Sequence, residues 1–259
     1  MRDVVVLGST GSIGEQTLEI VRANPEKFRV VGLAAGSSNV DRLIAQAREF
    51  DVAIVGTTAT NLSNRDVADG VEIIDGIDAA KQIASLPCDV VVNGISGSIG
   101  LGPTLAALEV GNTVALANKE SLVAGGDLVV AHGRDRLIPV DSEHSALFQA
   151  MKSGKLSEVS KVVLTASGGP FRQRYDLGSV TVDEALAHPT WSMGPVVTIN
   201  SATLVNKGLE IIEAHYLFDI PYSKIEAVIH PQSIVHSMVE FVDGSTIAQA
   251  SPPNMKGPI

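Results

Sequence analysis

Short apolar runs rich in β-branched residues alternate with longer amphipathic segments through the first half of the chain. The runs VVVL, FRVVGLA, VAIVG, DVVVNGI, TVALA and LIPV lie between Val4 and Val140, and segments such as GEQTLEIVRAN and VDRLIAQAREF separate them. Strands that are apolar throughout and alternate with helices are typical of a parallel sheet covered on both faces. The pattern therefore predicts an α/β domain with a doubly wound parallel sheet over residues 1–141.

The pattern changes after Asp141, where polar loops become longer. One strong helix is expected from about Ala202 to Leu217, and SMVEFVDGSTIAQA predicts a hairpin. In that hairpin Asp243-Gly244 supplies a positive-φ turn between two alternating runs. We expect residues 142–259 to form an α+β domain, and we read the last segment, SPPNMKGPI, as a loop.

Composition narrows the class of protein. Its 259 residues carry 29 acidic and 19 basic side chains, for a net charge of −10 and no basic run, which argues against a nucleic-acid partner. Cys88 is the only cysteine, so no internal disulfide can form and we assign it a buried structural role. No signal-peptide core and no apolar stretch of about 18 residues is present, so we expect a soluble cytoplasmic protein with no membrane partner.

A glycine turn follows the first expected strand. In VVVLGSTGSIGEQTLEIV, Gly8, Gly11 and Gly14 have the spacing G-x-x-G-x-x-G between a strand and a helix. Glycines let the backbone approach a pyrophosphate, and the amide groups at the start of the helix hold its charge. The turn predicts a Rossmann-like dinucleotide-binding domain; the alternative is a plain tight turn.

The second strand ends on residues that bear on the choice of dinucleotide. An NAD enzyme usually places Asp or Glu there, whereas this chain has Gly36, Ser37, Ser38 and Asn39, with Arg42 one turn later. Neutral donors and an arginine suit a 2′-phosphate. We therefore expect NADPH rather than NADH.

Two carboxylates stand close together in IPVDSEHSA. Asp141 and Glu143 could cap and solvate the start of a helix, or they could bind a cation together with Glu210 from the later helix. Three hard oxygen donors suit Mg²⁺ or Mn²⁺, whereas zinc favours His or Cys. The alternative for the stripe of Asn206, Glu210 and Glu213 is a solvated helix face, on which Lys207 and Glu210 form an incidental salt bridge.

Several polar residues could surround a small phosphate beside that cation. Ser167 lies in a glycine-rich turn, Ser201 precedes the helix, and Lys207 lies within it. The segment AHPTWSMGP carries Trp191, which either anchors a fixed loop or forms part of a lid that closes on substrate. Four histidines are assigned to the surface or to a satisfied core: His132, His144, His215 and His236.

Seven ordered segments resemble the 1-deoxy-D-xylulose 5-phosphate reductoisomerase family: GSTGSIG, LANKESLV, PVDSEHSA, TASGGPF, HPTWSMG, NSATLVNKGLE and HPQSIVHSMV. The resemblance spans the chain. It implies an NADPH- and divalent-metal-dependent enzyme that rearranges and reduces 1-deoxy-D-xylulose 5-phosphate to 2-C-methyl-D-erythritol 4-phosphate in non-mevalonate isoprenoid biosynthesis. The route, retro-aldol/aldol or α-ketol, stays open.

The resemblance also implies roles for individual residues. The implied metal ligands and other catalytic residues are Asp141, Glu143, Glu210, Lys119 and His188. The implied substrate contacts are Lys119, Ser142, Glu143, Ser167, His188, Trp191, Met193, Ser201, Asn206, Lys207 and Glu210. The implied NADPH contacts are Gly8, Ser9, Thr10, Gly11, Ser12, Ile13, Gly14, Gly36, Ser37, Ser38, Asn39, Asn118, Glu120 and Gly194.

The chain departs from the family in two places. Many members have a lysine where this chain reads GSSN, which leaves Ser37, Ser38 or Arg42 for the 2′-phosphate. Members also continue into a C-terminal helical domain that we expect this chain to lack, and they form homodimers through the second domain, for which the Asp243-Gly244 hairpin is our candidate contact. Two alternatives are a non-catalytic dinucleotide-binding paralogue and another NADP-dependent reductase of a metal-chelated hydroxy-carbonyl phosphate.

Overall fold

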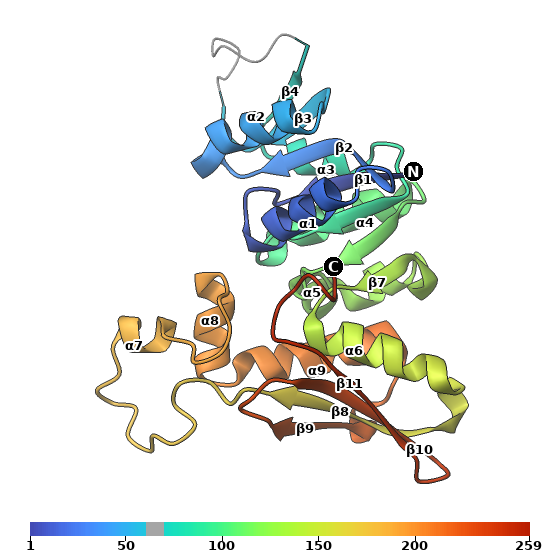
Figure 1. The fold of residues 1–259 in the computed structure, drawn as a ribbon, viewed down its shortest axis with the longest axis vertical. Coiled ribbons are helices and arrows are strands. Elements are labelled where there is room, and N and C mark those ends of the chain that lie inside the picture. The colour runs from blue at the N-terminus through green and yellow to red at the C-terminus, as the bar shows by residue number, and fades with distance from the viewer. Residues whose placement is uncertain (61–69) are drawn as a thin grey trace. The chain divides into compact units, whose positions relative to one another are not determined.

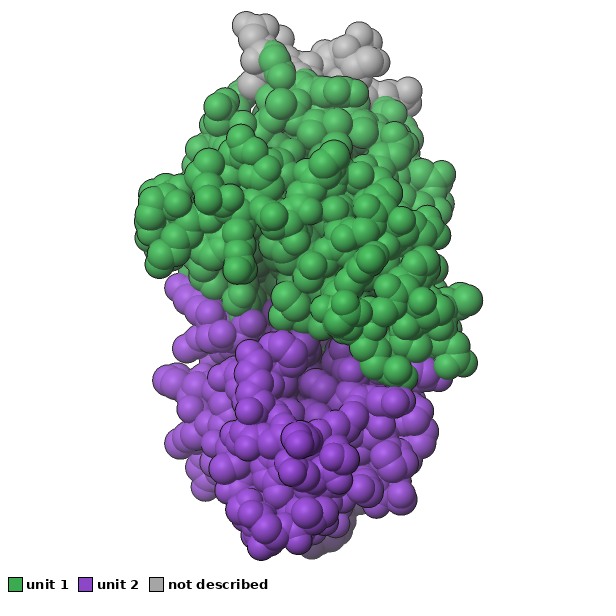
Figure 2. All heavy atoms as spheres, turned by 90° about the vertical axis from the view of Figure 1, so that its right-hand side faces the viewer, with its two compact units in different colours: residues 1–138, 259 green, residues 139–258 purple. Residues whose placement is uncertain are grey.

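The chain forms two compact units in a computed structural model that describes residues 1–60 and 70–259. Unit 1 comprises residues 1–138 with Ile259, and unit 2 comprises residues 139–258 (Figure 2). This division lies close to the boundary expected after Asp141. The assignment of NADPH binding to the first domain and catalysis to the second stays a prediction.

Unit 1 is built on a sheet with the strand order β4-β3-β2-β1-β5-β6-β7 among the described residues (Figure 1). The strands are β1 Arg2–Leu7, β2 Phe28–Ala35, β3 Ile54–Thr57, β4 Glu72–Asp75, β5 Val90–Asn93, β6 Thr113–Leu116 and β7 Leu137–Pro139. The pairings that join β4 through β6 are parallel. The order runs outward in both directions from β1, which is the doubly wound arrangement.

Helices cover both faces of this sheet. They are α1 Ser12–Ala23, α2 Val40–Glu49, α3 Ala79–Ala84, α4 Leu101–Glu109 and α5 Glu120–Val130, with 3₁₀ turns at Ser37–Asn39, Ser98–Gly100 and Arg134–Arg136. Consecutive strand residues point to opposite faces, and Val4, Val5, Val6 and Leu7 are all buried. The predicted doubly wound sheet is therefore confirmed.

Unit 2 pairs a mixed sheet with helices. The strands are β8 Val159–Ala166, β9 Ile225–Ile229, β10 Val235–Phe241 and β11 Thr246–Ala250, in the order β11-β10-β8-β9. Strand β8 runs parallel to β9, whereas β10 is antiparallel to both β8 and β11. The predicted hairpin is confirmed as β10 and β11, and Gly244 has a φ of 83° in its turn.

The helices of unit 2 are α6 Ser142–Ala150, α7 Val182–Leu186, α8 Pro195–Ala202 and α9 Val205–Phe218, with 3₁₀ turns at Met151–Ser153, Leu156–Glu158 and Tyr222–Lys224. Helices α6 and α9 lie over one face of the sheet (Figure 1), where Leu147 and Ala214 pack against Val162, Leu164 and Val239. This shared apolar core fixes the two helices relative to each other. Among the described residues, no helix combines the length and the apolar character that a membrane span requires.

The helix expected from about Ala202 begins later than predicted. Helix α8 ends at Ala202, and Leu204 has a φ of 62° before α9 begins at Val205. A left-handed leucine is uncommon, and no glycine or proline at this point in the sequence announces the break. The two helices are therefore separate elements, and α9 ends at Phe218, before a left-handed Asp219.

Candidate active site

Three carboxylates from two helices meet in unit 2. Asp141 immediately precedes α6, Glu143 lies in the first turn of that helix, and Glu210 lies in α9. Each offers an oxygen within 4.8 Å of the others. Glu210 is only 2% exposed, and Asp141 and Glu143 are half-buried, so this is a partly buried acidic cluster rather than a solvated helix face.

Lys207 lies among these carboxylates. Its ammonium group donates to Glu143 Oε1 at 2.9 Å, to Glu210 and to the backbone carbonyl of Thr165 on β8. The side chain is buried, so its charge is compensated by the carboxylates rather than by water. The incidental surface salt bridge considered from the sequence is therefore wrong.

The pKa values of these groups show how crowded the charges are. Burial, followed by the charge of Glu210, raises the pKa of Glu143 to about 7 even though Lys207 acts in the opposite direction. Burial disfavours the charge on Lys207, but Glu143 and Glu210 outweigh that effect and raise its pKa. One ammonium group therefore leaves an excess of negative charge, which a divalent cation would neutralise. The all-oxygen donor set fits Mg²⁺ or Mn²⁺.

Neighbouring polar groups orient the carboxylates. Ser142 Oγ donates to Glu143 Oε2 at 2.5 Å, and Asn206 donates its side-chain amide to Glu210. Ser237 on β10 donates to the backbone carbonyl of Glu143 at 2.8 Å. The predicted residues Ser142, Asn206 and Lys207 thus all contact the acidic cluster.

Two residues without a predicted role also lie at the cluster. His144 and Glu213 are both fully buried, and His144 Nδ1 lies 3.5 Å from an oxygen of Asp141 and 3.5 Å from an oxygen of Glu213. Burial opposes a charge on His144, but Glu213 and Asp141 outweigh it and raise its pKa to about 9. The assignment of His144 to the surface or to a satisfied core missed this contact; its spacing of three residues from Asp141 was the available signal.

A second group of predicted residues surrounds the turn after β8. His188 Nδ1 accepts hydrogen bonds from the backbone amides of Thr190 and Trp191, at 3.2 and 2.9 Å. Its Nε2 therefore carries the proton and donates to Ser167 Oγ at 2.9 Å. Ser167 and His188, 21 residues apart, form one polar pair.

The same turn lies against α8. Gly169 has a φ of 68°, and a Cβ there would lie 2.5 Å from the carbonyl oxygen of Ser201. Ser201 Oγ donates within its helix to Val197 O at 2.8 Å. The Trp191 ring lies 5.9 Å from that of His236 on β10, and the same segment carries the half-buried Met193.

The glycine turn of unit 1 is a close-packed backbone structure. Gly8 has a φ of 74°, and a Cβ on it would lie 2.8 Å from the carbonyl oxygen of Gly94. A Cβ on Gly14 would lie 2.3 Å from the carbonyl oxygen of Gly8. Helix α1 starts at Ser12 without a side-chain cap, so its first amides are available to an anion. The other predicted contacts in this turn are Ser9, Thr10, Gly11 and Ile13.

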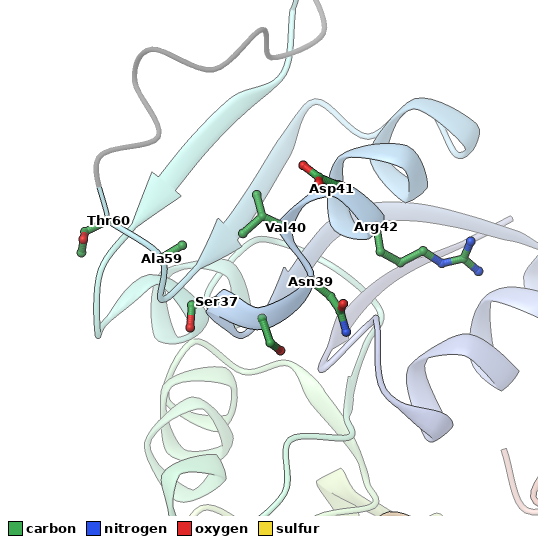
Figure 3. A pocket seen from close by; sticks show the side chains of 8 residues that line it. Ser37, Asn39, Val40, Asp41, Arg42, Ala59 and Thr60 are labelled. Carbon is green, nitrogen blue, oxygen red and sulfur yellow. The ribbon is translucent and has the colours of Figure 1, made fainter.

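A pocket of about 320 Å³ opens where β2 and β3 end. It is lined by Ser37, Ser38, Asn39, Val40, Asp41, Arg42, Ala59 and Thr60. Figure 3 shows the Arg42 side chain extending away from Ser37 and Thr60. Arg42 instead makes two hydrogen bonds to Glu15 on α1, at 2.8 and 2.9 Å. Gly36 precedes the pocket, and a Cβ on it would meet nothing within 4 Å.

The predicted residues near α5 have structural contacts of their own. The Asn118 side-chain amide donates to the carbonyls of Ile95 and Gly97 and to Glu120 Oε2, at 2.7 to 2.9 Å. Lys119 is buried directly before the helix. Gly194 belongs to unit 2, where it is exposed at the start of α8.

Comparisons with known proteins agree with one another. A family model described as 1-deoxy-D-xylulose 5-phosphate reductoisomerase matches residues 4–126, and one described as its C-terminal domain matches residues 137–218. The chain is 60% identical over 270 residues to the enzyme of that name from Beutenbergia cavernae and 62% identical over 262 residues to that from Leifsonia xyli subsp. xyli. These alignments cover 100% of this chain and 68% of each relative.

Solved structures lead to the same family. A DOX-P reductoisomerase in complex with NADPH, fosmidomycin and magnesium superimposes with a TM-score of 0.93 at 41% identity, covering 100% of this chain and 68% of that one. A homoserine dehydrogenase from a hyperthermophilic archaeon, at 13% identity and a TM-score of 0.61, shares the fold alone. The chain belongs to the 1-deoxy-D-xylulose 5-phosphate reductoisomerase family.

Proposed function

We propose that this chain converts 1-deoxy-D-xylulose 5-phosphate to 2-C-methyl-D-erythritol 4-phosphate, with NADPH as the reductant and Mg²⁺ or Mn²⁺ as the metal. The reaction rearranges the carbon skeleton of the sugar phosphate and reduces the resulting aldehyde, a step of isoprenoid biosynthesis. The observation that carries the proposal is the partly buried cluster of Asp141, Glu143 and Glu210, in a chain 60% identical to a named family member.

The three carboxylates are the proposed metal ligands. Mg²⁺ or Mn²⁺, when bound, polarises the hydroxyl and carbonyl oxygens of the substrate. Lys207 binds Glu143 and Glu210 and so holds the α6 and α9 ligands together, while Ser142 orients Glu143. Asn206 orients Glu210 in the same way. Because Lys207 and Glu210 are buried, their charges act in a medium of low polarity, which strengthens their electrostatic effect at the site.

The turn after β8 is the proposed phosphate site. The hydroxyl of Ser167 can donate to a phosphate oxygen while it accepts from His188 Nε2. Ser201 lies against the same turn, and its hydroxyl could leave the Val197 carbonyl to meet the phosphate. Contacts at this end of the substrate supply binding energy remote from the reacting carbons, which helps to orient them. Trp191 and Met193 belong to the proposed lid.

The glycine turn of unit 1 is the proposed NADPH pyrophosphate site. Its glycines leave no side chain over the amides that begin α1. We assign the 2′-phosphate to Ser37 and Ser38 in the pocket at the end of β2. Arg42 is held by Glu15, so we expect it to set the charge near the pocket rather than to provide the first contact.

The decisive test is NADPH oxidation by this chain with 1-deoxy-D-xylulose 5-phosphate. We expect oxidation with Mg²⁺ or Mn²⁺, none with EDTA, and at least a tenfold lower kcat/KM with NADH. The variant Asp141→Asn should lose at least about a hundredfold in activity, because even groups that only orient a ligand contribute 10–100-fold. Metal-independent oxidation, or full activity of the variant, would contradict the proposal.

Two finer features complete the proposal. We infer a homodimer formed through the sheet of unit 2, with the hairpin at Asp243 and Gly244 in the interface, and a cytoplasmic location. Exposed apolar residues lie at this end of the hairpin: Val242 in the turn that follows β10 and Ile247 on β11. Sedimentation of the chain should give twice the mass of one copy, and charged substitutions at Val242 and Ile247 should shift it towards the monomer.

A further inference from the structure

A buried histidine and a buried glutamate lie beside the proposed metal ligand Asp141. His144 on α6 and Glu213 on α9 are both 0% exposed. A buried carboxylate is strongly disfavoured unless a partner compensates its charge, and His144 is the partner beside Glu213.

The ring of His144 connects both helices that carry the ligands. Its Nε2 lies 2.8 Å from the backbone carbonyl oxygen of Glu210. A carbonyl oxygen can only accept, so Nε2 carries a hydrogen and donates it. Its Nδ1 faces oxygens of Asp141 and Glu213, each at 3.5 Å. The imidazole of His144 thus contacts the side chain of the ligand Asp141 and the backbone of the ligand Glu210.

Packing fixes the plane of this ring. The aromatic ring of Phe218, also on α9, stacks on His144 with an interplanar angle of 11° and a centroid separation of 6.4 Å. Rotation of the imidazole would break the contact with the Glu210 carbonyl and move Nδ1 away from Asp141. The ring is therefore held in the orientation that connects the two ligands.

We propose that Glu213 and His144 are positioning residues that hold Asp141 and the backbone of Glu210 in the geometry needed for metal binding. The inference rests on the proposed function, because it requires Asp141 and Glu210 to be metal ligands. Glu213 attracts the imidazole through Nδ1, the same ring nitrogen that faces Asp141, and His144 restrains the Asp141 carboxylate at the start of α6. Groups that orient ligands in this way typically change metal affinity by 10–100-fold.

The test compares Glu213→Gln with the wild-type chain in direct Mn²⁺ binding, measured by electron paramagnetic resonance without substrate or NADPH. We expect the dissociation constant for Mn²⁺ to rise by about tenfold or more with one site per chain retained. Glu226→Gln is the matched control, since Glu226 forms an exposed ion pair with Lys161 on the outer part of the sheet. That control should bind Mn²⁺ as the wild type does.

A second variant guards against loss of folding. If circular dichroism shows that Glu213→Gln is unfolded, Glu213→Asp replaces it. Aspartate keeps the negative charge but is shorter by one methylene. Glu213→Asp should therefore weaken Mn²⁺ binding by less than His144→Gln does. Mn²⁺ affinity of a folded Glu213→Gln or His144→Gln variant within twofold of the wild type would overturn the inference.

Two other outcomes separate this inference from neighbouring hypotheses. The oxygens of Asp141 and Glu213 and a nitrogen of His144 lie within 4.8 Å of one another, which also suits direct coordination. Two Mn²⁺ ions per wild-type chain, with one lost in Glu213→Gln, would replace positioning by a second metal site. Failure of the wild type to bind Mn²⁺ would instead overturn the proposed function itself.

Discussion

The candidate site of unit 1 consists mainly of backbone atoms, whereas that of unit 2 consists of charged side chains. In unit 1 the glycine turn is continuous in sequence and would bind through backbone atoms. Gly8 and Gly14 are required there because no space is left for a Cβ. In unit 2 the acidic cluster is discontinuous and works through side chains, with Glu143 and Glu210 held about Lys207. A site made of backbone atoms depends on close packing, whereas a site made of charged side chains depends on neutralisation of each charge by a neighbour.

This difference has a consequence for folding. The glycine turn is held before any ligand binds by backbone hydrogen bonds such as the one from the amide of Gly11 to the carbonyl of Gly8, and its open amides at the start of α1 carry no net charge. The acidic cluster instead concentrates negative charge in a buried position, which opposes folding unless a cation is present. Mutations should therefore disturb unit 1 through packing and unit 2 through electrostatics.

The largest effect is expected on removal of the buried ammonium group. Lys207→Met leaves Glu143 and Glu210 buried without their shared partner, and breaking such a pair reduces the free energy of unfolding by about 3 kcal/mol or more. We expect this loss in EDTA, and a partial recovery when Mg²⁺ is added because the metal replaces some of the lost positive charge. Urea unfolding with each additive measures both changes.

Lys161→Met is the matched control for this comparison. Lys161 forms ion pairs with Glu226 and Glu240 on a partly exposed part of the sheet. Its removal should leave the midpoint of urea unfolding nearly unchanged, with no dependence on Mg²⁺. Equal losses for the two lysine variants would show that burial does not distinguish them.

A smaller effect, of a different kind, is expected in the glycine turn. In Gly14→Ala the new Cβ meets the Gly8 carbonyl oxygen at 2.3 Å and the Ser9 Cα at 2.4 Å, both of which are backbone atoms that cannot rotate away. Overpacking of this kind reduces stability by about 1–3 kcal/mol. NADPH binding, measured by fluorescence titration, should weaken, whereas Mn²⁺ binding to unit 2 should be unchanged.

Gly208→Ala in α9 is the matched control, because nothing lies within 4 Å of its Cβ position. Alanine is favoured over glycine in a helix interior by up to about 1 kcal/mol, so this variant should be neutral or more stable in thermal unfolding. If Gly14→Ala also proved neutral, the close approach at the turn would not be the reason for glycine there.

The parts of the fold that could be predicted are those in which apolar and polar residues follow a local pattern. The apolar strands of unit 1 and the hairpin around Gly244 follow from patterns a few residues long. Strand β4, Glu72–Asp75, was not predicted, because EIID is a short polar edge strand whose residues are exposed or half-buried. The break at Leu204 was not predicted either, since a leucine gives no local signal for a left-handed conformation.

The candidate site was predictable in its residue types but not in its assembly. Asp141, Glu143 and Glu210 could be nominated as oxygen donors, yet only tertiary packing of α6 on the same core as α9 brings them within 4.8 Å. His144 was assigned to the surface or to a satisfied core, since a histidine in the sequence does not reveal its partners. Glu213 was seen on the stripe with Glu210, but its contact with His144 depends on the other helix.

The smallest expected effect concerns residues 188–191 of unit 2, where a side chain accepts hydrogen bonds from the backbone. His188 Nδ1 accepts from the amides of Thr190 and Trp191, so protonation there would break both hydrogen bonds. Burial, and then the charge of Arg172, lower the pKa of His188 below its usual value of 6.5. The unfolded chain therefore takes up this proton first as the pH falls.

The sign of the pH dependence follows from that order. The stability that neutral His188 contributes is fully present above pH 6.5 and declines as the pH falls below that value towards the lowered pKa. Trp191 is the only tryptophan, so its fluorescence reports the turn directly. We expect its emission to change in this window in the wild type and not in His188→Asn.

His236, whose pKa is also lowered by burial, lies against the same indole, so His236→Asn is the matched control. A transition that disappears in His236→Asn and persists in His188→Asn would assign the pH dependence to the stacked ring rather than to the backbone hydrogen bonds.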